Sequence, residues 1–278
     1  MRAAVVGHVE WIEFARVARV PHPGEIVHAG ETWHEPAGGG AVSAVQLCKL
    51  AGAATLFTAF GDDETGHRAE RGLRELGLDL RAVFRDEAQR RGFVHVDEAG
   101  ERTITVLGPR LGPRGADPLP WDELDGADAV YFTAGDPEAA CQARRARTLV
   151  ATARGIETLN EAAVELDALV SSRKDPGERY REGDLEPPPR LVVRTAGAAG
   201  GEWSDQDGAS GRWQATPLPG PVSDAYGSGD SFAAGLTFGL GAGKPLAAAL
   251  ELAARCGAAC LTGRGPYQRQ LRLRESAQ

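Results

Sequence analysis

A glycine-rich segment late in the chain has the residue types needed to handle a phosphoryl group. It reads DAYGSGDSF, and an apolar run that predicts a helix follows at once. The first turn of a helix leaves backbone N–H groups unpaired and carries partial positive charge, so it can hold an anion. Glycines let that anion come close to the backbone. We therefore expect an anion hole at Gly227, Ser228 and Gly229.

Asp230 follows these three residues and would lie beside the bound anion. A carboxylate in that place can accept a proton from an attacking hydroxyl group. The pattern thus indicates phosphoryl transfer to an alcohol. The same letters also fit an ordinary loop with an acidic helix cap, because short glycine-rich patterns recur by chance. Other parts of the chain have to decide between the two.

Composition limits the classes of protein to which the chain can belong. Its 278 residues, 42% hydrophobic and 25% charged, are typical of a soluble globular protein with one large α/β domain. The net charge of −8 argues against a nucleic-acid partner. No apolar run approaches the roughly 18 residues of a membrane span. The N-terminal segment becomes acidic too soon for a secretory signal, so we expect a cytoplasmic protein.

The positions of the lysines and cysteines argue against two kinds of site, a GxxxxGK[ST] phosphate loop and a cysteine-bound metal. Lysine occurs only at Lys49, Lys174 and Lys244, so the chain has no GxxxxGK[ST] phosphate loop. Cys256 and Cys260 are one helical turn apart, but no His or further Cys lies nearby in the sequence. We expect these two cysteines to be buried small hydrophobic residues and not metal ligands.

Short β-rich runs alternate with amphipathic stretches along the chain. This alternation predicts an α/β fold of three layers (α/β/α), with a mostly parallel sheet between helices. Ligands of such sheets bind at the carboxyl ends of the strands. The expected strands are 3–7, 55–61, 129–135, 148–152, 168–172 and 191–197.

Two segments depart from this alternation. Residues 92–108 have the period of a β-hairpin, and residues 25–35 are expected to form a second hairpin that turns at Ala29 and Gly30. We expect a single domain over residues 1–278, with a discontinuous β lid formed by about 12–36 and 89–108. The alternative is a pair of surface hairpins on the α/β core. The exposed edge of a lid could also join two copies of the chain in a homodimer.

With these elements assembled, the chain resembles the PfkB family of carbohydrate and nucleoside kinases, which have the ribokinase-like fold. DAYGSGDSFAAG is similar to the family signature DTxGAGDxFxxG, which implies that Asp230 is the catalytic base and that residues 227–229 form the anion hole. AGGGAVSAVQLCKLAG resembles GGxxxNxAxxLxxLG. This resemblance places Gly38, Gly39 and Ser43 at the sugar, Ser43 standing where the family has Asn.

Further matches concern the nucleotide. RTAGAAGG is similar to the TxGxxG segment, which implies that Thr195, Gly197 and Gly200 lie near the nucleotide phosphates. Asp224, the first residue of the opening signature, is also expected to bind the cofactor. The family's NxxE motif appears as Ser172 and Asp175, so Asp175 is the expected, weak support for magnesium. GDDETG (residues 61–66) is similar to the family's GxDxxG, and the GERT turn of the 92–108 hairpin resembles that of the family's lid strand. Both segments occur in the same order along the chain as in the family.

The chain also departs from the family pattern. Ile12 stands where the family has a sugar-binding Asp, and Glu10 or Glu13 could replace that acid; Glu10 is the expected substrate contact. Ala225 stands where family members often have Thr. Together with Ser172, this change leaves open whether a monovalent cation is required.

The resemblance implies an ATP- and Mg²⁺-dependent kinase that phosphorylates a hydroxymethyl group of a small sugar or polyol. One alternative is a nucleoside kinase, in which Trp11 or Trp33 would stack on a base. Another is a binding protein of the same fold with impaired catalysis. We expect His8, at the end of the first strand, to be a structural residue. A dinucleotide-binding oxidoreductase is set aside because GxGxxG is absent.

Overall fold

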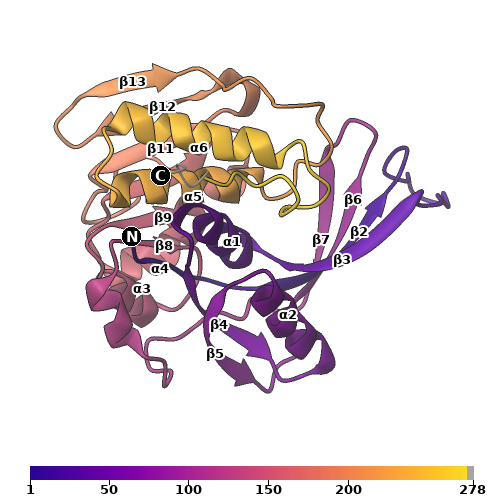
Figure 1. The fold of residues 1–278 in the computed structure, drawn as a ribbon, viewed down its shortest axis with the longest axis horizontal. Coiled ribbons are helices and arrows are strands. Elements are labelled where there is room, and N and C mark those ends of the chain that lie inside the picture. Colours follow the sequence, from indigo (N-terminus) through magenta and orange to yellow (C-terminus); the bar gives the residue numbers. More distant parts are fainter. Residues whose placement is uncertain (274–278) are drawn as a thin grey trace, which may run out of the picture.

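Two β-sheets of different size organise the chain in the computed structural model, which describes residues 1–273 (Figure 1). The large sheet has nine strands in the order β13-β12-β11-β10-β9-β8-β1-β4-β5. Their bounds are β1 Ala3–Val6, β4 Thr55–Gly61, β5 Asp79–Arg85, β8 Ala129–Phe132, β9 Leu149–Thr152, β10 Ala168–Ser172, β11 Leu191–Thr195, β12 Gly201–Asp205 and β13 Ser210–Trp213. All neighbours are parallel from β11 to β5, whereas β12 and β13 are antiparallel.

Helices cover both faces of the large sheet, which confirms the predicted three-layer fold (Figure 1). Alternate residues of β1 face opposite sides: Val5 packs in the cluster of α1, α5 and α6, and Val6 in the cluster of α3 and α4. This alternation is the period of two expected of a strand that is buried on both faces. The helices are α1 Gly39–Ala51, α2 Glu64–Glu75, α3 Pro137–Ala143, α4 Ile156–Ala162, α5 Ser228–Gly241 and α6 Leu246–Cys260.

The small sheet projects from one side of the α/β body (Figure 1). Its order is β3-β2-β6-β7, with β2 Glu10–Arg16, β3 Glu31–Ala37, β6 Arg91–Val96 and β7 Arg102–Leu107. β2 is antiparallel to β3 but parallel to β6, and β6 and β7 form the predicted hairpin. The small sheet therefore joins two segments that lie far apart in the sequence.

The expected hairpin within residues 25–35 is wrong. Residues 25–30 form no strand, and β3 pairs instead with β2, from Glu10 opposite Ala37 to Arg16 opposite Glu31. Pro21 and Pro23 precede the false strand, and proline has no N–H group for a strand ladder. Three strands of the large sheet were also missed, namely β5, β12 and β13. β5 and β13 are the edges of the sheet and β12 lies next to an edge, and all three have many polar or half-exposed residues.

The two cysteines of α6 are buried, as predicted. Cys256 and Cys260 are both 0% exposed and free, and burial raises the pKa of each thiol to about 12. Within residues 1–273, no group of His, Cys, Asp and Glu side chains is arranged to hold a metal ion by itself. None of the helices in this part of the chain has both the length and the apolar character needed to cross a membrane.

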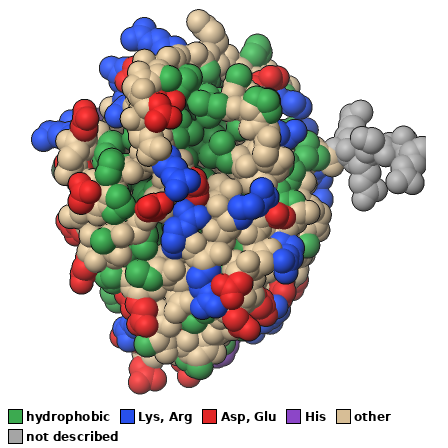
Figure 2. All heavy atoms as spheres, turned by 90° about the vertical axis from the view of Figure 1, so that its left-hand side faces the viewer, with side chains coloured by type: hydrophobic (Ala, Val, Ile, Leu, Met, Phe, Trp, Pro, Cys, Tyr) green, Lys and Arg blue, Asp and Glu red, His purple; other side chains and the backbone are tan. Residues whose placement is uncertain are grey.

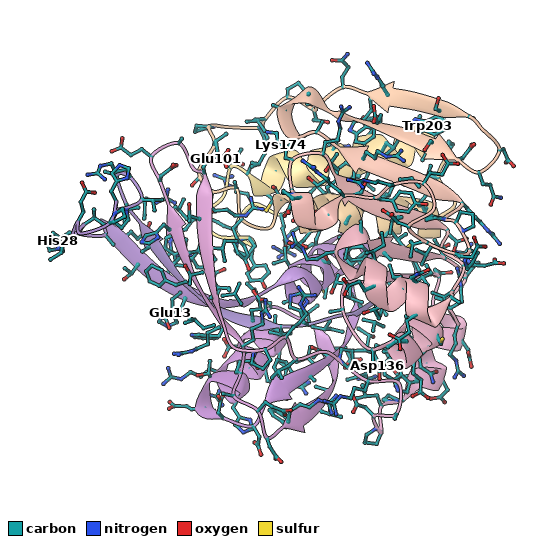
Figure 3. All side chains as sticks on the ribbon, turned by 180° about the vertical axis from the view of Figure 1, so that it is seen from behind. Glu13, His28, Glu101, Asp136, Lys174 and Trp203 are labelled. Carbon is teal, nitrogen blue, oxygen red and sulfur yellow. The ribbon has the colours of Figure 1, made fainter. Side chains whose placement is uncertain are left out.

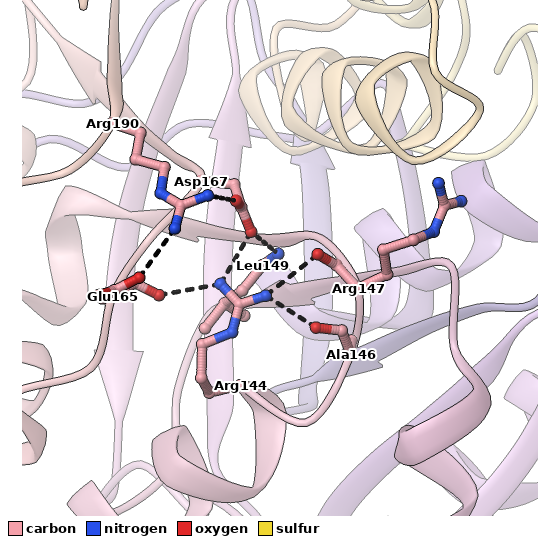
Figure 4. Close-up of polar contacts among 7 residues, drawn as sticks. All are labelled: Arg144, Ala146, Arg147, Leu149, Glu165, Asp167 and Arg190. Atoms are coloured by element: carbon pink, nitrogen blue, oxygen red, sulfur yellow. Dashed lines mark hydrogen bonds and ion pairs between the residues drawn. The ribbon is translucent and has the colours of Figure 1, made fainter. Parts of the chain in front are cut away.

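A network of ion pairs ties the amino ends of β9, β10 and β11 together (Figure 4). Asp167, just before β10, accepts hydrogen bonds from Arg144 Nη1 and from the backbone N–H of Leu149, both at 2.8 Å. Arg190, just before β11, contacts Asp167 at 3.4 Å and Glu165 at 2.9 Å. This edge of the sheet lies opposite to the carboxyl ends, where ligands of such folds bind.

The molecular face turned away from the small sheet carries acidic and basic side chains in alternation (Figure 2). This face therefore offers no continuous basic surface.

Candidate functional site

Asp230 lies in the first turn of α5, directly after the glycine-rich loop. Gly227 caps this helix with φ of 78°, and a Cβ atom on it would lie 2.8 Å from Cβ of Pro266, so both conformation and space require glycine. Burial, and secondarily the charge of Glu178, raises the pKa of Asp230 to about 6, although Arg102 and Arg154 act in the opposite direction. The loop thus brings a carboxylate with a raised pKa to a helix N-terminus.

The paired glycines Gly38 and Gly39 lie directly opposite Asp230. A Cβ atom on Gly39 would lie 3.1 Å from Oδ1 of Asp230 and 3.6 Å from Cε1 of His8. Gly38 has φ of 88°, and a Cβ atom there would lie 3.0 Å from Cγ of Glu10. The amino ends of α1 and α5 therefore meet across a narrow space that a glycine pair keeps open.

Glu10 reaches this space from β2. Its Oε1 atom accepts a hydrogen bond of 2.5 Å from Nε of Arg90 and lies 3.5 Å from Nε2 of His8. Burial alone would raise the pKa of Glu10, but His8 and Arg90 outweigh it, so the pKa is lowered and the group is an anion. Glu13, the second candidate for the substrate-binding acid, is exposed on the outer side of the small sheet (Figure 3). Ile12, which stands where the family has Asp, is fully buried.

Ser43 is brought to the site, but its side chain faces a helix. It is 0% exposed, and its Oγ donates a hydrogen bond of 3.3 Å to the backbone carbonyl of Asp230. Ser43 therefore links α1 to the first turn of α5. A contact between Ser43 and substrate stays a prediction.

The segment expected at the nucleotide phosphates follows β11. Thr195 donates a hydrogen bond of 3.2 Å from Oγ1 to the carbonyl of Ser171, and the next residues form a tight turn in which Gly197 and Gly200 have positive φ angles of 61° and 77°. The side chain of Lys174, visible in Figure 3, lies 3.0 Å from the place of a Cβ atom on Gly197. An ammonium group beside a glycine turn is suited to bind phosphate oxygens.

Asp224 is buried below the glycine-rich loop at 0% exposure. One oxygen accepts from the backbone N–H of Tyr226 at 2.9 Å, and the other from that of Gly265 at 3.1 Å. Burial raises the pKa of Asp224 despite these bonds. Asp224 fixes the loop that leads to α5, and its binding to a nucleotide stays a prediction.

Asp175 lies between β10 and the short helical turn Pro176–Glu178, on the same side of the molecule as Lys174. Its Oδ1 accepts from the backbone N–H of Gly177 at 2.9 Å, and its Oδ2 pairs with Arg154 at 2.5 Å. Burial opposes ionisation here, but the bonds to Gly177 and Arg154 lower the pKa. Arg154 also pairs with Oε1 of Glu178.

These contacts fit a magnesium ion that arrives bound to a nucleotide. Magnesium in proteins prefers one or two carboxylates together with waters and substrate phosphates, and not a cage of protein ligands. Asp175 and Glu178, which both pair with Arg154, supply such a pair of carboxylates, and the charge of Glu178 acts on Asp230.

Several residues of the site had not been predicted as functional. His8 was expected to be structural, yet it contacts Glu10 and faces Gly39. Arg90, Arg154 and Glu178 belong to no motif, and their partners lie 21 to 80 residues away in the sequence. Only the fold reveals them.

Trp33 and Trp11 pack within the protein. The ring of Trp33 is stacked on Phe14 with 4.8 Å between centroids, and the guanidinium of Arg264 lies over it at 4.4 Å. Trp11 packs against His34 at 5.3 Å. Trp33, which is buried, has no free face for a nucleoside base.

Comparison with known proteins agrees with this geometry. A model of the pfkB family of carbohydrate kinases matches residues 2–271. An ATP-dependent ribose-1-phosphate kinase from Halopiger xanaduensis is 30% identical over 277 residues, which cover 93% of this chain and 91% of that protein.

Two solved structures show the same fold. Ribokinase from Thermotoga maritima has a TM-score of 0.78 at 20% identity, over 98% of this chain and 96% of that one. The nucleoside kinase from Methanocaldococcus jannaschii has a TM-score of 0.72 at 17% identity, over 97% and 95%. The family match spans the glycine pair, the loop of Asp230 and both sheets, and the resemblance stated from the motifs is confirmed: this chain belongs to the pfkB family of carbohydrate kinases.

Proposed function

We propose that this protein transfers the γ-phosphoryl group of ATP to a hydroxymethyl group of a small sugar or related polyol. The observation that carries the proposal is the position of Asp230, at the amino end of α5 and opposite Gly39. A hydroxyl group bound in this space lies within reach of the carboxylate, which accepts its proton as the oxygen attacks phosphorus.

The backbone amides at the start of α5 would stabilise the charge on the moving phosphoryl group. Oriented donors of this kind lower a barrier by roughly 3–4 kcal/mol per contact. Thr195, Gly197, Gly200 and Lys174 would bind the nucleotide from the carboxyl ends of β10 and β11. Magnesium, when bound with ATP, neutralises charge on the phosphates, and Asp175 and Glu178 would hold it through direct or water-mediated contacts.

The small sheet would act as a lid over the acceptor. β2 carries Glu10 and β6 begins just after Arg90, so the ion pair between these residues fixes the base of the lid beside Asp230. A lid that excludes water prevents loss of the phosphoryl group to hydrolysis.

Two further parts of the proposal concern assembly and location. Apolar side chains of β6 and β7 are 36 to 44% exposed (Phe93, Ile104, Val106 and Leu107). This surface would pair two copies of the chain, which sedimentation of the wild type and of an Ile104→Lys variant would test. A kinase that draws on the cellular ATP pool would act in the cytoplasm.

A sugar acceptor is favoured over a nucleoside because Trp33 is packed between Phe14 and Arg264. The test is an ADP-release assay with Mg-ATP and a panel of pentoses, hexoses, polyols, sugar phosphates and nucleosides. Asp230→Asn should bind ATP, unfold at a similar temperature and lose at least about 1,000-fold in kcat, since general-base catalysis and charge positioning both fail. Retained turnover in this variant would remove Asp230 from the role of base. Binding without turnover in the wild type would instead favour an impaired binding protein.

A further inference from the structure

A cavity of about 430 Å³ lies beside the candidate site, at the carboxyl ends of β8 and β9. Its walls include residues 109–114, which follow β7, residues 132–136, and Arg154, Gly155, Glu157 and Thr158. Figure 3 shows Asp136 of this wall at the start of α3. Thr133 connects the cavity with the reaction site. Its Cβ atom and Oδ1 of Asp230 lie 3.8 and 3.1 Å from the same point, the place of a Cβ atom on Gly39. A molecule bound at Asp230 can therefore extend into the cavity.

Arginine dominates the charge of this cavity. Arg85, Arg110, Arg114 and Arg154 line it. Arg85 is neutralised by Asp117 through two hydrogen bonds, and Arg154 by Asp175 and Glu178. In the part of the chain that the structure describes, the side chains of Arg110 and Arg114 form no hydrogen bond or ion pair.

Arg110 lies within electrostatic reach of the reaction site, because the charges of Glu10, Arg90 and Arg154 all affect its pKa. Burial of part of its side chain, and then the charge of Arg90, lowers the pKa of Arg110, which remains a cation at neutral pH. Arg90 donates a hydrogen bond to Glu10 only from its Nε atom. Within residues 1–273, its two terminal nitrogens have no acceptor. The charge of Arg90 thus acts on Arg110, and both guanidinium groups have N–H donors without a protein acceptor in residues 1–273.

Neutral polar groups at the same junction also lack partners. Oγ1 of Thr133 and Nδ1 of His8 are buried and form no hydrogen bond, and their residues are only 3% and 7% exposed. Buried polar atoms are normally satisfied by protein, water or ligand. His8 and Thr133 lie with Asp230 around the place of a Cβ atom on Gly39, and the charge of Arg110 acts on His8, so an oxygen-rich ligand there would satisfy these groups.

The acidic residues of the cavity wall do not cancel these cations. Asp136 caps α3 and accepts from the N–H groups of Gly115 and Ala139. Glu87 and Glu157 are exposed to solvent. The cavity wall therefore carries two arginines, Arg110 and Arg114, whose charge no neighbouring carboxylate of residues 1–273 neutralises.

We infer that the acceptor is a sugar monophosphate whose own phosphate binds to Arg110 and Arg90, while its hydroxymethyl group lies at Asp230. The inference rests on the proposed function and specifies the acceptor. Arginine binds phosphate oxygens in a bidentate manner, so a guanidinium group that lines the cavity without a partner in residues 1–273, with a second arginine acting on its charge, is suited to bind a phosphate. The strand order supports this choice, because the cavity lies at β8, β9 and Arg85 of β5, whereas the nucleotide segment follows β10 and β11.

The reaction leaves the acceptor's own phosphate unchanged. The hydroxymethyl oxygen forms a bond to the γ-phosphorus of ATP, and the bond from that phosphorus to the bridging oxygen of ADP breaks. The hydroxyl proton goes to Asp230. The product is a sugar bisphosphate with its two phosphates at opposite ends, and ADP leaves. The relative from Halopiger xanaduensis is named a ribose-1-phosphate kinase, and ribose 1-phosphate is a sugar monophosphate.

The test compares D-ribose with α-D-ribose 1-phosphate, using kcat/KM for turnover and isothermal titration for binding. We expect the wild type to prefer the phosphorylated sugar by at least about 100-fold. In Arg110→Gln this preference should fall about 10- to 100-fold through KM, since a hydrogen-bonded charge pair is lost. Arg110→Lys should recover part of it, because the charge remains and the bidentate geometry does not. Thr133→Val, in which no protein hydrogen bond is broken, should weaken binding of the sugar phosphate about 5-fold.

Arg71→Gln is the matched control, since Arg71 is exposed on α2 and does not line the cavity. Equal kcat/KM for the two sugars in the wild type would overturn the inference. An unchanged preference in Arg110→Gln, or an increase confined to the KM of ATP, would overturn it as well. If no acceptor is turned over, the proposed function fails, yet binding of ribose 1-phosphate that is lost in Arg110→Gln would still support the phosphate site.

Discussion

The Oδ1 atom of Asp230 lies 3.1 Å from the point at which a Cβ atom on Gly39 would stand. These residues are the first of α1 and the third of α5, so the amino ends of two helices converge on one carboxylate. Partial positive charge from both ends favours an anion between them. The relationship explains why the two glycine-rich motifs, almost 200 residues apart in the sequence, belong to one site.

The pKa of Asp230, raised by burial to about 6, predicts a pH dependence of turnover. A general base must be ionised, so kcat/KM for the acceptor should be flat above pH 7 and fall about tenfold per unit below pH 6. The measurement is a pH series at constant ionic strength. Glu35→Gln is the control, since burial also raises the pKa of Glu35, to about 7. The acid limb should persist in that variant; its disappearance would assign it to Glu35.

Gly39→Ala should reduce kcat with little effect on stability. The new methyl group would press on the carboxylate of Asp230, and a displacement approaching 1 Å at a reacting group can cost about 100-fold in rate. Gly30→Ala is the matched control, because nothing lies within 4 Å of a Cβ atom there and its φ is not positive. Steady-state kinetics and thermal unfolding of both variants decide the matter. A normal kcat in Gly39→Ala would show that the site tolerates this methyl group.

Contiguous motifs made the reactive part of the site predictable. The loop before α5 and the glycine pair before α1 are short runs in which residue type and spacing determine local geometry, so Asp230 and Gly39 could be located from sequence. The alternation of strands and helices predicted the large sheet for the same reason. The strands at or next to its edges, β5, β12 and β13, were not predicted, because their many polar residues lack the pattern of a buried strand.

Pairing between distant segments was not predictable. Arg90 and Glu10 are 80 residues apart, and neither stands in a pattern that marks a partner. The false hairpin at residues 25–35 had the same origin, since the true partner of β3 is β2, across a loop with two prolines. Parallel pairing of β2 with β6 leaves no local signal at all.

Glu35→Gln should change how stability depends on pH. Glu35 of β3 has one oxygen without a hydrogen-bond partner, and burial raises its pKa from 4.5 to about 7. In the folded state the protonated form is favoured. The stabilising contribution of protonated Glu35 to the free energy of unfolding is therefore complete below pH 4.5 and is lost as the pH rises through 7.

Between pH 5 and pH 8, the free energy of unfolding of Glu35→Gln should rise by about 2 kcal/mol relative to that of the wild type. Urea unfolding at the two pH values measures this. Glu13→Gln, at an exposed position on the neighbouring strand, serves as the control. Parallel stability curves for Glu35→Gln and the wild type would show that the carboxyl group is not buried as the structure places it.

Asp167→Asn should lower stability without altering the KM of either substrate. The carboxylate binds Arg144 and the N–H of Leu149 at the amino ends of the strands, and Arg190 lies 3.4 Å away (Figure 4). Asparagine removes the charge that holds two guanidinium groups together. Because this network is only partly buried, the expected loss is about 2 kcal/mol, less than for a fully buried pair.

The control for this loss is Asp125→Asn, which also removes a carboxylate bonded to an arginine, Arg145, but at an exposed site. Exposed pairs contribute little because water screens them, so this variant should unfold close to the wild type. Thermal and urea unfolding would rank the three proteins, and ADP release would give their KM values. If Asp167→Asn instead raised a KM while unfolding normally, the amino ends of β9 to β11 would be coupled to the site at the opposite edge of the sheet. A loss of stability alone would mean that this edge holds the strands in place while the carboxyl edge binds and reacts.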